Sequence, residues 1–194
     1  MQEQIIQLYL ASTSPRRCEL LQQLGVTLEV VPVDIDESIK KNENAHDYVC
    51  RMALEKARQG SQQAGKDTMP VLGSDTSVVL ENEVFGKPQD KQQACVMLNA
   101  LSGKTHEVLT AVALIQGDRE KVILNISQVT FKVLNEAEIL AYWESGEPAD
   151  KAGSYAIQGK GAKFIKHLSG SFSGVMGLPL YETSELLAEF GVEL

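Results

Sequence analysis

The 194-residue sequence has few cysteines and histidines, and those it has are scattered. The three cysteines form no CxxC pair, and an odd number cannot all be joined within one chain, so we expect free thiols in a reducing cytoplasm. The three histidines join no Cys/His cluster. A structural zinc site is therefore not expected.

Long apolar runs are also missing. The N-terminal segment has no basic region ahead of a signal-length apolar stretch, and the apolar run around residues 111–115 is far shorter than a membrane span. We therefore expect a cytoplasmic protein without a membrane partner. A net charge of -8, from 26 acidic and 18 basic residues, disfavours nucleic-acid polymers as partners. A small anionic ligand remains compatible, because it needs only one positive pocket.

Two common catalytic signatures are absent. The sequence has no GxxxxGK[ST] loop, which argues against a P-loop enzyme. It has neither a GxSxG elbow nor a reactive Cys–His context, which argues against acyl transfer.

Strand-like and helix-like segments alternate along the chain, with at least one hairpin, which predicts an α/β fold with a mixed sheet. No repeat or linker divides the sequence, so we expect a single domain over residues 1–194. Strands are predicted at residues 5–11, 27–33, 69–80, 105–116, 121–134 and 161–170. Helices are predicted at residues 15–24, 45–64, 90–101, 136–145 and 180–190, with Ser14 as a cap and Asn135–Glu138 as a capping box.

The segment LASTSPRR, residues 10–17, contains the first candidate site. An apolar strand ends, hydroxyl side chains follow, and a helix begins with its N–H groups free to bind an anion. Cations are disfavoured at a helix N-terminus, so Arg16 and Arg17 indicate a negative ligand nearby. The alternative is that both arginines are solvated residues of the first helical turn.

A lysine interrupts an apolar helix face. Lys56 shares a stripe with Val49, Met52, Ala53 and Ala57 in the segment 45–64. A lysine there either snorkels to solvent or points into a cleft where it meets an anion.

Three further features complete a set suited to phosphate chemistry. Asp75 follows an apolar strand, where ligands gather in α/β folds, although it could simply form a turn. Lys87 lies between a glycine and a proline, and residues 34–38 (DIDES) offer oxygen ligands for Mg²⁺ or only a solvated acidic run. Together, these cations and carboxylates predict hydrolysis of a phosphate ester or anhydride.

The motifs also resemble those of a known family, the Maf family of house-cleaning nucleoside triphosphate pyrophosphatases. The resemblance rests on LASTSPRR, DIDES, LEKA, GSDT, GKP, LSGKTHEVLTAVAL, DKAGSYAIQGKGAKFI and GSFSGVMGLPLYET, in order along the chain. It implies an elongated mixed sheet with two lobes around a cleft, related to the inosine-triphosphate pyrophosphatases. It also implies a divalent metal, Mg²⁺ or Mn²⁺, a homodimer, and conversion of a nucleoside triphosphate to the monophosphate and pyrophosphate.

The resemblance assigns roles to individual residues of this sequence. Asp75 corresponds to the proton acceptor, and Glu37 to a metal or water partner. Lys56 and Lys87 would hold phosphates. Ser12 and Arg17 would line the phosphate-binding turn.

The resemblance also bears on the substrate. Arg16, Thr76 and Gln158 match the branch that acts on dTTP and UTP, whereas the branch similar to 7-methyl-GTP pyrophosphatases has a bulky aromatic, a glutamine and a glutamate there. A glutamine amide can pair with the carbonyl and N–H of uracil or thymine. Small departures from the family pattern are Ala156, Ala162 and Met176.

Two other functions stay open on the sequence. One is a nucleotide-binding regulator of cell division without significant catalysis. The other is a pyrophosphatase for a modified purine such as 7-methyl-GTP. Modified pyrimidine triphosphates also stay open as substrates.

Overall fold

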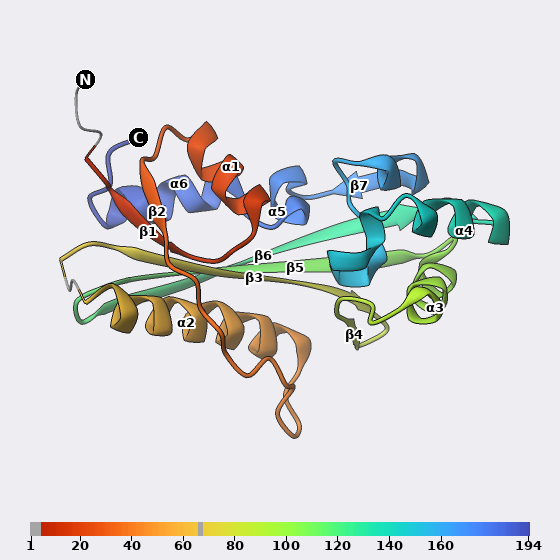
Figure 1. The fold of residues 1–194 in the computed structure, drawn as a ribbon, viewed down its shortest axis with the longest axis horizontal. Helices are drawn as coiled ribbons and strands as arrows, with labels where there is room; N and C mark the ends of the chain where they lie inside the picture. The colour runs from red at the N-terminus through yellow and green to blue at the C-terminus, as the bar shows by residue number, and fades with distance from the viewer. Residues whose placement is uncertain (1–4, 66–67) are drawn as a thin grey trace.

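The computed structural model describes residues 5–65 and 68–194, which form a seven-stranded mixed sheet flanked by helices (Figure 1). The strands are β1 (Leu8–Ala11), β2 (Leu28–Val30), β3 (Val71–Leu80), β4 (Glu83–Phe85), β5 (Thr105–Gln116), β6 (Arg119–Phe131) and β7 (Ile165–Ser169). The helices are α1 (Pro15–Gln23), α2 (Ala45–Ala64), α3 (Lys91–Leu101), α4 (Glu136–Glu144), α5 (Phe172–Met176) and α6 (Leu180–Glu189). Short 3-10 helices cover η1 (Glu147–Asp150), η2 (Ala152–Ser154) and η3 (Lys160–Phe164).

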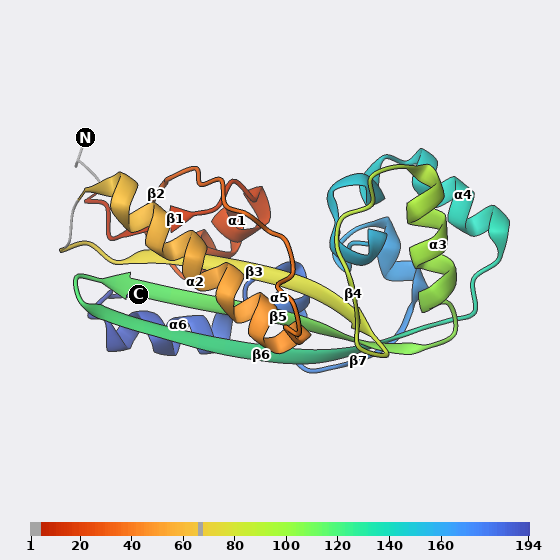
Figure 2. The same ribbon diagram turned by 90° about the horizontal axis from the view of Figure 1, so that it is seen from below.

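The sheet confirms the predicted mixed α/β class. Its order is β2-β1-β3-β5-β6-β7, with β4 paired to β3. β1 and β2 run parallel, β1 and β3 run parallel, and the remaining pairs are antiparallel. The long strands β3, β5 and β6 run the length of one end of the molecule and reach the base of the other (Figure 2). We call the elements β1, β2, α1, α2, α5 and α6 at one end the first lobe. The second lobe contains β4, β7, α3, α4 and the 3-10 helices at the other end.

Opposite faces of the sheet are covered by different helices in the first lobe (Figure 1). α2 packs on one face against β3 and β5, whereas α1 and α6 pack on the other face. Side chains on a strand alternate between the two faces, so neighbouring residues of β3 face different helices. Leu72 packs with α1 and α6, while Val79 packs with α2.

Close packing of α2 depends on small residues. A Cβ atom added to Gly73 of β3 would lie 2.3 Å from the Ala53 carbonyl oxygen and 2.5 Å from the Ala57 backbone nitrogen. The α2 backbone therefore rests directly on β3 at this point. This approach allows a long side chain from the same helix to reach the middle of the strand.

The second lobe has an aromatic core. Phe131, Tyr142, Tyr155 and Phe164 are buried there and meet mainly edge to face, a favourable geometry for aromatic rings. His106 joins them, with its Nε2 2.9 Å from Tyr155 Oη. In the part of the chain that the structure describes, no helix is both long enough and apolar enough to cross a membrane.

Several expected elements differ in the structure. The segment 161–170 was predicted as one strand, but residues 160–164 form a 3-10 helix and only Ile165–Ser169 form β7. The reason is that a carboxylate, that of Glu147, accepts hydrogen bonds from the backbone N–H groups of Lys160 and Gly161. The short helix α5 was not predicted, and β1 and β2 are shorter than expected.

The helix caps were predicted with mixed success. The capping box of Asn135 and Glu138 at α4 is confirmed. The prediction that the Ser14 side chain caps α1 is wrong, because the side chain makes no capping hydrogen bond. The backbone N–H of Ser14 instead donates to Ser12 Oγ, at 3.2 Å.

Replacement of Gly73 by alanine tests the close packing of α2. The added methyl group would meet backbone atoms that cannot rotate away, so we expect Gly73→Ala to lower the free energy of unfolding by about 1–3 kcal/mol. Denaturant unfolding measures the change. Gly86→Ala is the control, because a Cβ atom there meets nothing within 4 Å, and equal stability losses in both variants would contradict the account.

Acid sensitivity tests the environment of His106. Burial lowers the pKa of His106 from 6.5 to about 4, so below pH 6.5 the unfolded chain binds a proton that the folded chain excludes. Stability should fall from pH 6.5 to 4 by about 1.4 kcal/mol per pH unit from this group. Urea unfolding of the wild type and His106→Gln isolates the effect. A stability difference between them that stays constant over this pH range would refute it.

Candidate active site

The candidate site lies at a gap in the pairing of β3. β1 pairs with β3 as far as Ala11 and Gly73, and β4 begins to pair at Val78. On that edge of β3, residues 74–77 therefore have no strand beside them within the described chain. A cleft of about 1000 Å³ opens at the gap and is lined by residues of both lobes.

All nine residues predicted for the site line this cleft. They are Ser12, Arg16, Arg17, Glu37, Lys56, Asp75, Thr76, Lys87 and Gln158. One placement differs from the expectation. Asp75 was predicted at the end of a strand, but it lies in the middle of β3, which continues to Leu80. It still reaches the cleft because β1 ends beside it and leaves the edge open.

On the α2 face of the sheet, a lysine joins two carboxylates. Lys56 Nζ lies 2.7 Å from Asp75 Oδ1 and 2.8 Å from Glu37 Oε1. The Lys56 and Asp75 side chains are only 12% and 13% exposed, so this ion pair is largely shielded from solvent. The second oxygen of Asp75, Oδ2, accepts only a long 3.5 Å hydrogen bond from Ser77 Oγ. It remains available to a ligand in the cleft.

The charge of Glu37 is stabilised by its surroundings. Burial alone would raise the pKa of Glu37, but the hydrogen bond and charge of Lys56, with the charges of Lys87 and Arg17, lower it overall. Glu37 is therefore ionised at neutral pH.

The segment that carries Glu37 has no regular secondary structure and is held by α2. Tyr48 Oη donates to the Glu37 carbonyl oxygen at 3.0 Å, and Arg51 Nη2 donates to the Ser38 carbonyl oxygen at 2.9 Å. Arg51 also binds Glu43 through Nε and Nη2, at 2.6 and 2.7 Å. Sequence analysis missed Tyr48 and Arg51. Their i,i+3 spacing on α2 was the only local signal that they share a surface.

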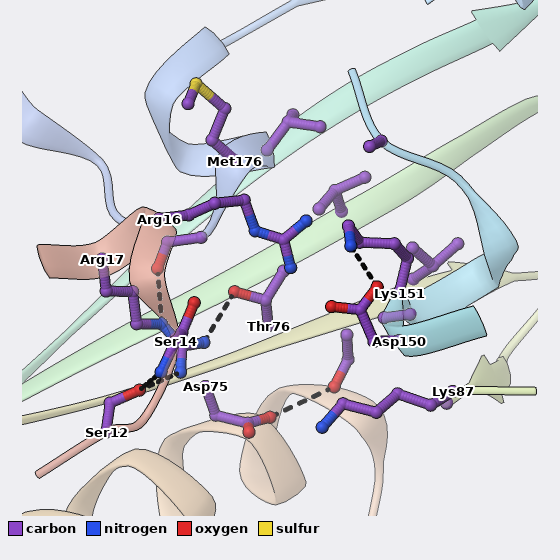
Figure 3. A pocket seen from close by; sticks show the side chains of 18 of the residues that line it. Ser12, Ser14, Arg16, Arg17, Asp75, Thr76, Lys87, Asp150, Lys151 and Met176 are labelled. Atoms are coloured by element: carbon purple, nitrogen blue, oxygen red, sulfur yellow. Dashed lines mark hydrogen bonds and ion pairs between the residues drawn. The ribbon is translucent and has the colours of Figure 1, made fainter. Parts of the chain in front are cut away.

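On the other face of the sheet, Arg17 is surrounded by neutral oxygens (Figure 3). Its Nε donates to the Gly177 carbonyl at 3.0 Å, and its terminal nitrogens donate to Ser12 Oγ and Thr76 Oγ1, each at 3.2 Å. Within the described chain, no carboxylate lies within 4.0 Å of Arg17. Burial lowers the pKa of Arg17, against the attraction of Asp75 and Glu37.

The arrangement around Arg17 suits an anion. Three of its five N–H groups are used by these bonds, which leaves one on each terminal nitrogen. A partly buried cation without a neighbouring carboxylate is costly unless an anion binds to it. Thr76 contributes indirectly, because its Oγ1 is bound by Arg17 and lies 3.0 Å from Thr110 Oγ1.

The remaining predicted residues leave their polar ends available. Lys87 follows β4 and is exposed, and Arg16 lies near the start of α1; neither forms an ion pair with another described residue. Gln158 is exposed on the second-lobe wall, and its side chain makes no hydrogen bond within the described chain. The cleft thus has cations at the β3 gap and a free amide on the far wall.

Sequence analysis missed other residues that line the cleft. They are Ser77, Glu147, Asp150, Lys151 and Tyr155, among others. Lys151 contacts Asp150 on the second-lobe wall (Figure 3). The segment containing Asp150, Lys151 and Tyr155 was quoted only as part of a family motif, so no individual role followed from it. Met176 and Ala156 line the cleft as well.

The donor set fits a divalent cation that shares its ligands with a substrate. No cluster of three or more His, Cys, Asp or Glu side chains within the described chain forms a metal cage. Glu37 and Asp75 each use one oxygen on Lys56, and the second oxygen of each could bind a cation. One or two carboxylates together with substrate phosphates are the usual ligands of Mg²⁺ in phosphate chemistry.

Comparison with known proteins places this geometry in a family context. Three relatives named dTTP/UTP pyrophosphatase are similar over nearly the whole chain. The protein from Alkalilimnicola ehrlichii is 51% identical over 190 residues, 96% of this chain and 94% of the relative. The protein from Methylococcus capsulatus is 53% identical, covering 99% of this chain and 95% of the relative. The protein from Xanthomonas euvesicatoria pv. vesicatoria is 55% identical, covering 95% and 98%.

A solved structure and a family model also match. The structure of the Staphylococcus aureus Ham1 protein covers 64% of this chain and 71% of that chain, with a TM-score of 0.43 and 13% identity. The family model described as Maf-like protein matches residues 7–190, nearly the whole chain. On this match, and on its similarity to the three relatives, the chain belongs to the Maf family.

Proposed function

We propose that this protein is a nucleoside triphosphate pyrophosphatase that hydrolyses dTTP and UTP to the monophosphate and pyrophosphate. The observation that carries the proposal is the pairing of two features at the β3 gap. Asp75, held by Lys56, keeps an oxygen free, and Arg17 lacks a carboxylate partner within the described chain. The names of the three relatives support the substrates.

The cations would bind the triphosphate. Arg17 offers two N–H groups in the planar geometry that matches a phosphate, while Lys87 and Arg16 add charge at the rim of the cleft. Lys56 would contribute differently from the predicted phosphate contact. Its ammonium already binds Asp75 and Glu37, so its first task is to fix those two carboxylates.

Asp75 is the proposed general base. Its Oδ2 accepts a proton from water as the water oxygen bonds to the α-phosphorus. The bond between the α-phosphorus and the α–β bridging oxygen breaks, and pyrophosphate leaves with that oxygen. The lysine contact at Oδ1 orients the carboxylate so that Oδ2 is the atom presented to the water.

A divalent cation, Mg²⁺ or Mn²⁺, is part of the proposal and would be held by Glu37 together with phosphate oxygens, which leaves Asp75 Oδ2 to accept the proton. When bound, it would supply additional neutralisation of the charge that develops on the phosphates. The chain provides the Glu37 carboxylate, and Tyr48 and Arg51 keep its segment in place for this task.

Base selection is assigned to the second lobe. Gln158 is exposed on the cleft wall with its amide unengaged, so it can donate to and accept from the edge of uracil or thymine. Ala156 and Met176, which depart from the family pattern, also line the cleft and would shape its walls. Ala162 does not line it, so its effect on the substrate would be indirect.

Location and partners complete the proposal on the sequence expectations, and assembly and the house-cleaning role complete it on the family resemblance. The protein is expected to act in the cytoplasm in a house-cleaning role, as a homodimer. It is expected to bind neither nucleic-acid polymers nor membranes, in keeping with its net charge of -8.

Asp75→Asn tests the catalytic assignment. The amide keeps an oxygen for Lys56 but cannot accept the proton, so we expect pyrophosphate release from dTTP and UTP to fall by about 10²–10⁴-fold with the fold intact. Release is measured with Mg²⁺ across the canonical triphosphates and 7-methyl-GTP. Asp118→Asn, in the exposed turn between β5 and β6, is the matched control.

The same panel separates the competing functions. Near-normal turnover by Asp75→Asn would refute the role of Asp75. Activity centred on 7-methyl-GTP would keep the enzyme but overturn the pyrimidine assignment. No release from any nucleotide by the wild type would favour a nucleotide-binding regulator.

Gln158→Glu tests the base contact. The carboxylate cannot donate to the base, so the preference for UTP over GTP, expressed as a ratio of kcat/KM values, should fall by about 10-fold or more. Gln63→Glu, on an exposed position of α2, introduces the same change of charge outside the cleft. A Gln158→Glu enzyme that keeps the wild-type preference would contradict the assignment of Gln158 to base recognition.

A further inference from the structure

Glu147 is a cleft residue that the proposed chemistry does not use. It begins η1, directly after α4, and its carboxylate is turned toward the segment 156–161. Glu147 Oε2 accepts from the Lys160 backbone N–H at 2.8 Å, and Oε1 accepts from the Gly161 backbone N–H at 3.0 Å. One side chain thus satisfies two consecutive backbone donors of a segment that contains Gln158.

Tyr142 extends the same network to the other side of Gln158. Its hydroxyl donates to Glu147 Oε1 at 2.6 Å and accepts from the Ala156 backbone N–H at 3.0 Å. Tyr142 is fully buried in the second-lobe core, so the hydroxyl is a fixed point. The segment 156–161 is therefore anchored before and after Gln158 by two side chains that bind each other. We call Glu147 and Tyr142 the clamp.

Glycine is required where the clamp meets the segment. A Cβ atom at Gly159 would lie 2.3 Å from Glu147 Oε2, and one at Gly161 would lie 2.6 Å from Tyr142 Oη. The backbone approaches the clamp so closely that a side chain at either position would have to displace Glu147 or Tyr142 from the place where it binds the segment. This contact accounts for the Gly-x-Gly pattern that follows Gln158.

The protonation states suit the network. Burial alone would raise the pKa of Glu147, but the hydrogen bonds from Tyr142 and from the Lys160 and Gly161 backbones lower it overall. Burial, reinforced by the hydrogen bond to Glu147, raises the pKa of Tyr142. At neutral pH the carboxylate is ionised and the phenol keeps its proton, so each group has the form that the hydrogen bonds need.

The clamp explains how a free glutamine can select a base. The Gln158 side chain has no hydrogen bond of its own within the described chain, so nothing but its backbone sets its direction. That backbone is held at Ala156 on one side and at Lys160 and Gly161 on the other. The side chain keeps its rotational freedom, but an amide carried on an anchored backbone loses less entropy on binding than one carried on a mobile segment.

We propose that Glu147, together with Tyr142, is a positioning residue for nucleobase selection, which fixes the segment 156–161 so that Gln158 faces the base. The inference rests on the proposed function, because it deepens the role of Gln158. It assigns no contact between Glu147 and the substrate, and it separates base selection in the second lobe from phosphate binding at the β3 gap.

Glu147→Gln and Tyr142→Phe test the clamp. Glutamine has the same shape, but its NH₂ group would oppose a backbone N–H, and phenylalanine removes the hydroxyl alone. Glu144→Gln is the matched control, because Glu144, 72% exposed, lies at the end of α4, the helix that carries Tyr142. For each variant, kcat/KM is measured with UTP and GTP, and inorganic pyrophosphate is used as an inhibitor that probes phosphate binding alone.

We expect both clamp variants to lower the UTP-to-GTP ratio of kcat/KM by about 10-fold, mainly through a higher KM for UTP. Inhibition by pyrophosphate should stay within about 2-fold of the wild type, a result that a general loss of structure would not give. Amide hydrogen exchange of residues 158–161 should accelerate in both variants and not in Glu144→Gln. An unchanged ratio, or equal weakening of UTP and pyrophosphate, would overturn the proposal.

The experiments distinguish failure of the clamp proposal from failure of the proposed function. If Gln158→Glu keeps the preference but Glu147→Gln loses it, the proposal is overturned, because base selection then depends on the anchored segment but does not act through Gln158. If Gln158→Glu loses the preference but both clamp variants keep it, the clamp fails and the Gln158 contact stands. Hydrogen exchange needs no turnover, so unchanged protection of residues 158–161 in Glu147→Gln would refute the anchoring even in a protein that hydrolyses none of the nucleotides.

Discussion

The contact of Lys56 with Asp75 and Glu37 is the interaction on which the site depends. Lys56 and Asp75 are largely buried, so removing either one would leave the other charge without compensation, while Glu37, 53% exposed, adds a second contact to Lys56. The contact exists only because α2 rests directly on β3 at Gly73, which brings Lys56 within reach of the middle of the strand. The packing of α2 on β3 therefore also fixes the position of the Asp75 carboxylate.

The gap in the pairing of β3 also allows residues on both faces of that strand to reach one cleft. Asp75 faces α2 and Thr76 faces Arg17, so consecutive residues serve opposite faces of the sheet. In a continuous sheet the two faces would be separated, but the gap between β1 and β4 joins them in one cleft. An acidic chain can therefore gather cations against a phosphate locally while its surface keeps a net negative charge.

The sequence predicts features that depend on neighbouring residues better than contacts between segments that are far apart in the chain. The predicted ranges of α2 and β5 agree with the structure, because the apolar stripe of a helix and an apolar run that ends at a turn are local signals. The apolar stripe left open whether Lys56 snorkels to solvent or points into a cleft toward an anion, and the structure places it in the cleft against two carboxylates. The partner of Arg17 at Gly177 and the hydrogen bonds of Glu147 to residues 160–161 could not be predicted, since they join segments that only the fold brings together.

The central claim is that water attacks the α-phosphorus of a pyrimidine triphosphate at the β3 gap. Hydrolysis of UTP in ¹⁸O-labelled water, followed by mass spectrometry of the products, tests it most directly. The account predicts one ¹⁸O atom in UMP and none in pyrophosphate. Label in pyrophosphate would place the attack on the β-phosphorus, and formation of UDP with labelled phosphate would place it on the γ-phosphorus. Either result, or the absence of turnover, would contradict the account.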